Sequence, residues 1–147
     1  MQSITVDAVV TNLDTVLNFT AAYLEEADCP LETMIQISIV VEELFVNIAN
    51  YAYPPYHTQA GTEAVATITG EVDGDPLGIT LQFIDGGVPY NPLEKPDPDI
   101  TLPAEARAIG GLGIYLVKKM VDTIQYEYRE GKNMLTIRKK FATPRRS

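Results

Sequence analysis

The chain has 147 residues, 46% of them hydrophobic and 21% charged, which is the composition of one ordinary globular domain with its own core. Its 20 acidic and 11 basic residues give a net charge of −9, so direct binding to nucleic acid or to an anionic membrane surface is not expected. The single cysteine, Cys29, excludes an intrachain disulfide. We see no signal-peptide pattern and no apolar run of membrane-spanning length. These observations together favour a cytoplasmic location.

Hydrophobic periodicity predicts the elements along the chain. A short β-branched strand at residues 4–10 is expected at a sheet edge, and Asn12 or Asp14 caps a helix that ends near Pro30. Residues 31–53 contain no glycine or proline and carry apolar side chains at helical spacing, which predicts a long, nearly buried helix. The remaining elements are strands at 64–72, 77–84, 123–129 and 134–141, a hairpin turn at 73–75 and a helix at 114–121.

This order of elements predicts a single α+β domain over residues 1–147. We expect a two-layer α/β sandwich, with a mixed, mostly antiparallel sheet and helices on one face. The strand at 77–84 is the most apolar, so it should be central. Residues 92–109, rich in proline and acidic side chains, show no regular period. They are interpreted as a lid over a functional site, and composition alone is equally compatible with a disordered insertion.

Three polar side chains stand on one face of the long helix. Glu43, Asn47 and Asn50 are spaced i, i+4 and i+7, and a polar stripe on an apolar helix is costly unless each member has a partner. A polar ligand against this face would supply those partners. The alternative is that the three side chains cap or bond neighbouring backbone inside the core.

Two later stretches also suggest a ligand. Asp85 ends the predicted central strand and is followed by Gly86 and Gly87, so a buried carboxylate could accept a hydrogen bond from the exocyclic amine of adenine. A strand-ending Asp-Gly turn is the alternative. Gly110-Gly111-Leu112-Gly113 opens a helix, and glycine amides at a helix N-terminus form an anion site. A glycine cluster alone is weak support, and it fits neither a dinucleotide fingerprint nor a phosphate loop.

Two other features are interpreted as structural. The one histidine, His57, follows a Tyr-Pro-Pro-Tyr turn and has no second histidine to share a metal, so a loop residue is expected. Basic side chains crowd the C-terminus, and a solvated last strand and tail explain them better than a binding patch does. They are Arg138, Lys139, Lys140, Arg145 and Arg146.

The three polar stretches together, in this order, resemble the GHKL ATPase superfamily, and more closely the anti-sigma-factor serine kinases of the RsbW and SpoIIAB type. Residues 43–54, with Glu43-x-x-x-Asn47, look like the N box. Residues 85–92, with Asp85-x-Gly87, look like the G1 box, and residues 107–114 look like the G2 box. The resemblance extends over nearly the whole chain.

The resemblance implies roles for the residues of the first two boxes. Glu43 would be the general base, and Asn47 would bind Mg²⁺. Asp85 would read the adenine of ATP, with Gly87 beneath the ring.

The third box would contact the triphosphate. The resemblance implies that Gly110, Gly111 and Gly113 close on the phosphates and that Arg107 reaches the γ-phosphate. Further nucleotide-site residues implied by the three boxes are Asn50, Pro89, Tyr90 and Leu112.

The resemblance implies an ATP-dependent protein serine/threonine kinase that also acts as an anti-sigma factor in a partner-switching system. Its implied partners are a STAS-type anti-sigma factor antagonist, which is phosphorylated on serine, a sigma factor, and a second copy of the chain in a homodimer. The alternative is a nucleotide-gated binding module with little or no phosphotransfer. The binding module predicts that Glu43→Ala leaves partner binding intact and that no phosphorylated partner ever appears.

Overall fold

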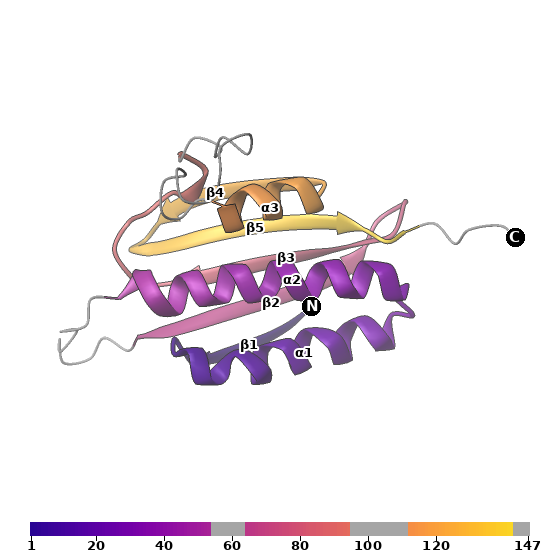
Figure 1. Ribbon diagram of the computed structural model, residues 1–147, viewed down its shortest axis with the longest axis horizontal. Helices are drawn as coiled ribbons and strands as arrows, with labels where there is room; N and C mark the ends of the chain where they lie inside the picture. Colours follow the sequence, from indigo (N-terminus) through magenta and orange to yellow (C-terminus); the bar gives the residue numbers. More distant parts are fainter. Residues whose placement is uncertain (54–63, 95–111, 143–147) are drawn as a thin grey trace, which may run out of the picture.

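The computed structural model describes residues 1–53, 64–94 and 112–142. Within these ranges helices cover one face of a five-stranded sheet with the order β1-β2-β3-β5-β4 (Figure 1). The strands are β1 (Gln2–Asp7), β2 (Val65–Asp73), β3 (Gly78–Asp85), β4 (Thr123–Arg129) and β5 (Lys132–Lys140). The helices are α1 (Leu13–Glu26), α2 (Leu31–Asn47) and α3 (Leu112–Met120).

All four strand pairings are antiparallel. The two-layer α+β class with helices on one face is therefore confirmed, and the sheet is antiparallel throughout the described strands rather than mixed. The edge position of β1 and the central position of β3 are also confirmed. Along β3 the buried residues Ile79, Leu81 and Phe83 alternate with half-buried Thr80 and Gln82, because neighbouring side chains of a strand point to opposite faces.

The long helix is less buried than its composition predicts. The side of α2 that packs on the sheet is closed, with Val40, Val41 and Phe45 all at 0% exposure. Its outer side carries Leu31 and Ile35 at 72% and 54% exposure. The expectation of a nearly buried helix was wrong because α2 lies between α1 and α3 in the outer layer, where only the sheet and two flanks cover it (Figure 1). No helix in the described part of the chain is both long and apolar enough to cross a bilayer.

The helix does not end as an α-helix. After Asn47 the backbone widens into one π-helical turn, Ile48–Ala52. Such turns are rare and are frequently found at functional sites. The turn brings the carbonyl of Ala52 against the loop that follows β3, where it accepts a hydrogen bond of 2.9 Å from the Val88 N–H. This contact joins the end of α2 to the end of the central strand.

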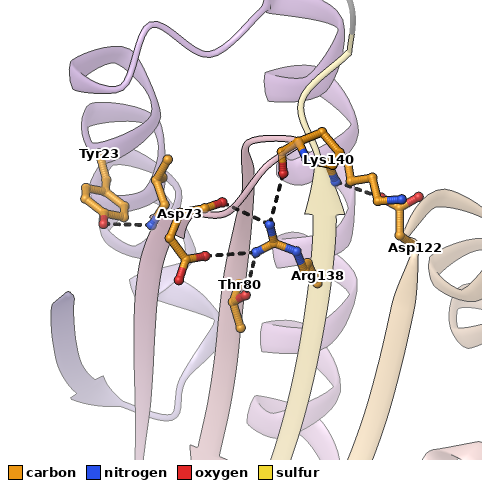
Figure 2. Close-up of polar contacts among 8 residues, drawn as sticks. Tyr23, Asp73, Thr80, Asp122, Arg138 and Lys140 are labelled. Atoms are coloured by element: carbon orange, nitrogen blue, oxygen red, sulfur yellow. Dashed lines mark hydrogen bonds and ion pairs between the residues drawn. The ribbon is translucent and has the colours of Figure 1, made fainter.

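At the end of the sheet opposite Asp85, the side chain of Arg138 in β5 bonds residues of β2 and β3 (Figure 2). Arg138 Nη1 donates to Asp73 Oδ1 at 3.0 Å and to Thr80 Oγ1 at 3.2 Å, and Nη2 donates to the Asp73 carbonyl at 2.9 Å. Beside it, the Lys140 N–H donates to Asp122 Oδ2 at 2.6 Å. The guanidinium of Arg138 thus has a structural role rather than being solvated, whereas Lys140 makes its contact through the backbone N–H and not through its charged side chain. Arg145 and Arg146, like His57, lie outside the described residues.

Candidate functional site

A cavity of about 590 Å³ opens where the C-terminal end of α2, the ends of β3 and β5 and the start of α3 meet. Its volume lies within the range of small-molecule sites, roughly 300–1,000 Å³. Its apolar walls include Leu44 of α2, Ile48 of the π-helical turn, Phe83 of β3 and Leu135 of β5. None of the described residues that line it carries a positive charge, and two of them, Glu43 and Asp85, are acidic.

Most of the described site residues predicted from the sequence meet in this cavity. They are Glu43, Asn47, Asp85, Pro89, Tyr90 and Gly113. Asn50 is exposed and does not line it, because the π-helical turn changes the number of residues per turn and rotates this position out of phase. The expected single polar face therefore ends at Asn47.

Of four other predicted site residues, the structure describes only Leu112. Leu112 is the first residue of α3. Arg107, Gly110 and Gly111 lie outside the described residues, as does the predicted lid from residue 95 onward. The start of that lid, Pro92–Glu94, forms one 3₁₀ turn.

Asp85 ends β3 with its carboxylate directed at the cavity and is only 7% exposed. Its Oδ1 accepts two hydrogen bonds, from the Gly87 N–H at 2.9 Å and from Asn133 Nδ2 at 2.9 Å. Asn133 is its register partner across the β3–β5 pairing. No donor among the described residues bonds Oδ2. Every fully buried polar side-chain atom among these residues has a hydrogen-bond partner, so the unbonded Oδ2 is not fully buried, and it faces the cavity that Asp85 lines.

Asn133 links the carboxylate to the loop after β3 and to β4. It is 5% exposed. Its Nδ2 also donates to the Val88 carbonyl at 2.9 Å, and its Oδ1 accepts from the Tyr90 N–H at 3.1 Å and from the Tyr126 hydroxyl. Burial, reinforced by the nearby charge of Asp85, raises the pKa of the Tyr126 hydroxyl above its usual value. The hydroxyl therefore remains protonated at neutral pH and available as a donor.

Sequence reasoning missed Asn133 because it placed this residue in the turn between the last two strands. The chain needs only Glu130 and Gly131 for that turn, and β5 already begins at Lys132. A period-2 pattern was present, since Asn133 precedes Leu135 and Ile137 on the inward face. That alternation was the available signal.

Glu43 lies beside the start of α3. A Cβ atom at position 113 would stand 2.1 Å from Glu43 Oε2, so only glycine leaves room for the carboxylate there. The N-terminal end of a helix is a favourable place for negative charge. Asn47 follows one helical turn after Glu43 and lines the same cavity.

Gly87 is required by a different neighbour. A Cβ at this position would stand 2.1 Å from the carbonyl oxygen of Ala52, a backbone atom that cannot swing away. The sequence suggests that this glycine makes room for a flat ring, and Gly87 is not among the residues that line the cavity. Its packing against Ala52 is by itself a sufficient reason for glycine.

The contact between Gly87 and Ala52 can be tested by substitution, with Gly86 as the control position. Gly87→Ala should lower the free energy of unfolding by about 2–4 kcal/mol, through overpacking and loss of the Val88–Ala52 hydrogen bond. Gly86→Ala is the matched control, because the nearest atom to its Cβ is Tyr53 Oη at 3.6 Å, an ordinary contact. Urea denaturation of both variants measures the difference. Equal losses would show that the Ala52 contact is not the reason for glycine.

Comparison with known proteins gives three findings. The family profile described as "Histidine kinase-like ATPase domain" matches residues 6–139. The chain is similar to the serine/threonine-protein kinase BtrW of Bordetella bronchiseptica, with 25% identity over 101 residues that cover 69% of this chain and 66% of that protein. Its fold is similar to the crystal structure of the RsbU and RsbW domains of Rv1364c from Mycobacterium tuberculosis, with a TM-score of 0.62, 14% identity and coverage of 99% of this chain. The match spans 34% of that solved chain, and just under two thirds of the curated relative.

Proposed function

The chain belongs to the histidine kinase-like ATPase domain family, and from that premise we propose that it binds Mg-ATP in this cavity and transfers the γ-phosphate to a protein serine or threonine. One observation carries the proposal. Glu43 and Asn47 of α2 and Asp85 of β3, which the sequence separates by about forty residues, line a single cavity large enough for a nucleotide.

The adenine end of the site is the part around Asp85. A buried carboxylate oxygen is costly unless a donor bonds it, and Oδ2 of Asp85 faces the cavity with no donor from the described residues. The exocyclic amine of adenine is a donor of the right kind. The apolar side chains of Ile48, Phe83 and Leu135 provide walls for the faces of the base.

The phosphate end of the site is the part around Asn47 and the start of α3. A triphosphate here would face Glu43 and no described basic residue, so its charge needs a cation. Mg²⁺ would supply that neutralisation. The amide oxygen of Asn47 would be its one protein ligand, which fits the finding that the described residues contain no cluster of three acidic, histidine or cysteine side chains. Arg107, Gly110 and Gly111 are proposed phosphate contacts on the resemblance alone.

Glu43 is proposed as the general base. Phosphoryl transfer depends mainly on positioning and charge, and the nucleophile must lose a proton as it attacks. The Glu43 carboxylate lies one helical turn from Asn47, on the same side of the cavity, where it would accept that proton from a hydroxyl.

The substrate and partners are proposed from the resemblance. We propose that the hydroxyl belongs to a serine of a STAS-type anti-sigma factor antagonist, and that the protein also binds a sigma factor as a homodimer in a cytoplasmic partner-switching system. The similarity to a protein named as a serine/threonine-protein kinase supports the reaction class.

Calorimetric titration with Mg-ATP and Mg-ADP, together with phosphotransfer from labelled ATP to candidate antagonist proteins, tests the proposal. Binding with label on a partner serine is the expected result. Binding without label on any candidate, while nucleotide still alters partner affinity, would favour a nucleotide-gated binding module instead. Absence of nucleotide binding would refute both.

Removing the amide of Asn47 tests the metal assignment. Asn47→Ala should weaken binding of Mg-ATP by about tenfold and leave binding of ATP in excess EDTA unchanged, because only the metal contact is lost. Asn18→Ala, on the exposed side of α1, is the matched control. Titrations of both variants with and without Mg²⁺ give the four affinities. An equal loss in EDTA would place Asn47 on the nucleotide itself.

A further inference from the structure

A carboxylate by itself does not select adenine. It accepts one hydrogen bond from the exocyclic amine of adenine, but guanine presents two adjacent donors, N1–H and the 2-amino group. A carboxylate with two open oxygens accepts both in a bidentate pair. Selection of adenine by Asp85 therefore requires that one of its oxygens be closed.

The hydrogen bonds around Asp85 close one oxygen. Oδ1 accepts from the Gly87 N–H and from Asn133 Nδ2, each at 2.9 Å, which occupies both of its lone pairs. Oδ2 takes no bond from the described residues and faces the cavity. The carboxylate thus offers the base one acceptor atom, although it has two oxygens.

The amide of Asn133 is held in this orientation by all of its contacts. Its nitrogen lies between two acceptors, Asp85 Oδ1 and the Val88 carbonyl, and its oxygen lies between two donors, the Tyr90 N–H and the Tyr126 hydroxyl. A flipped amide would place its oxygen against Asp85 Oδ1 and the Val88 carbonyl, and its nitrogen against the Tyr90 N–H. The amide therefore cannot release Oδ1 by rotation.

We infer that Asn133 is a specificity-determining residue, which makes Asp85 a single acceptor and so favours adenine over guanine. It acts through Asp85 and is a positioning residue rather than a catalytic one. The inference rests on the proposed function, since it concerns the base of the nucleotide bound there. Guanine in this site leaves one of its two donors without an acceptor beside Asp85, a residue that is only 7% exposed.

Affinities for Mg-ATP and Mg-GTP in the wild type, Asn133→Leu and Asn133→Ala test the inference. The wild type should prefer ATP, and both variants should reduce the ratio of ATP to GTP affinity by about tenfold, because Oδ1 becomes open to the second donor of guanine. General loss of structure would lower both affinities and leave the ratio unchanged. Tyr128→Phe is the control, since it removes a hydroxyl from an exposed residue of β4 that does not line the cavity, and it should keep the wild-type ratio.

A second measurement needs no variant. Inosine triphosphate lacks the 2-amino group of guanine but keeps N1–H. With one acceptor on Asp85, the wild type should bind inosine triphosphate at least as tightly as GTP, because the extra amine finds no partner. GTP binding tighter than that of inosine triphosphate would overturn the inference, as would an unchanged ATP-to-GTP ratio in folded Asn133 variants. A wild type that binds no nucleotide would overturn the proposed function itself, and the inference with it.

Discussion

Asp85→Asn weakens ATP binding by about 2–3 kcal/mol, which is a loss of roughly 30- to 160-fold in affinity. The amide oxygen of the new side chain can still accept from the Gly87 N–H and Asn133 Nδ2, so the local fold is retained. Its nitrogen then faces the cavity in place of Oδ2, and it meets the exocyclic amine of adenine as donor against donor. Calorimetric titration with Mg-ATP measures the loss.

The control for this variant is Glu71→Gln, which removes one negative charge from the exposed end of β2, away from the cavity. It should leave the affinity within about twofold of the wild type, since surface charges contribute little. Thermal unfolding of Asp85→Asn should show a folded protein. Unchanged ATP affinity in that folded variant would remove Asp85 from the nucleotide site and leave it as a strand-ending residue.

Glu43→Gln should reduce the rate of phosphotransfer by about 10²- to 10⁴-fold and leave ATP affinity nearly unchanged. Glutamine keeps the shape of the side chain beside Gly113 but cannot accept a proton at neutral pH. A loss in the rate without a loss in affinity is the result expected when a group acts on the nucleophile rather than on the nucleotide. Single-turnover transfer from labelled ATP to a partner protein measures the rate.

Two further variants make the assignment specific. Glu42→Gln changes the adjacent, exposed carboxylate on the same helix and should transfer phosphate at the wild-type rate. Gly113→Ala leaves Glu43 in place but puts a Cβ atom 2.1 Å from the present position of its Oε2. Because this oxygen is the end of a flexible side chain, Gly113→Ala should displace the carboxylate and slow transfer with little loss of stability. Wild-type transfer by Glu43→Gln would exclude Glu43 as the base.

The sequence by itself determined most of the helices and strands and the polar residues at their ends. Local signals set the strands and helices: the period-2 and helical patterns, the turn at 73–75, and the break at Pro30. Asp85 could be placed at the end of a central strand because that strand is the most apolar one. Glu43 and Asn47 could be placed together because a helical turn separates them.

Only the tertiary structure showed how the ends of α2, β3 and β5 meet, and which oxygen of Asp85 remains available to a ligand. Asn133 lies 48 residues after Asp85, and its role comes from strand register, which no local pattern specifies. The π-helical turn after α2, which leaves Asn50 exposed and places Ala52 against Gly87, was likewise seen only in the structure. The exposed outer side of α2 follows from its place in the outer layer. Periodicity reports which residues share a face, whereas long-range pairing determines what lies opposite that face.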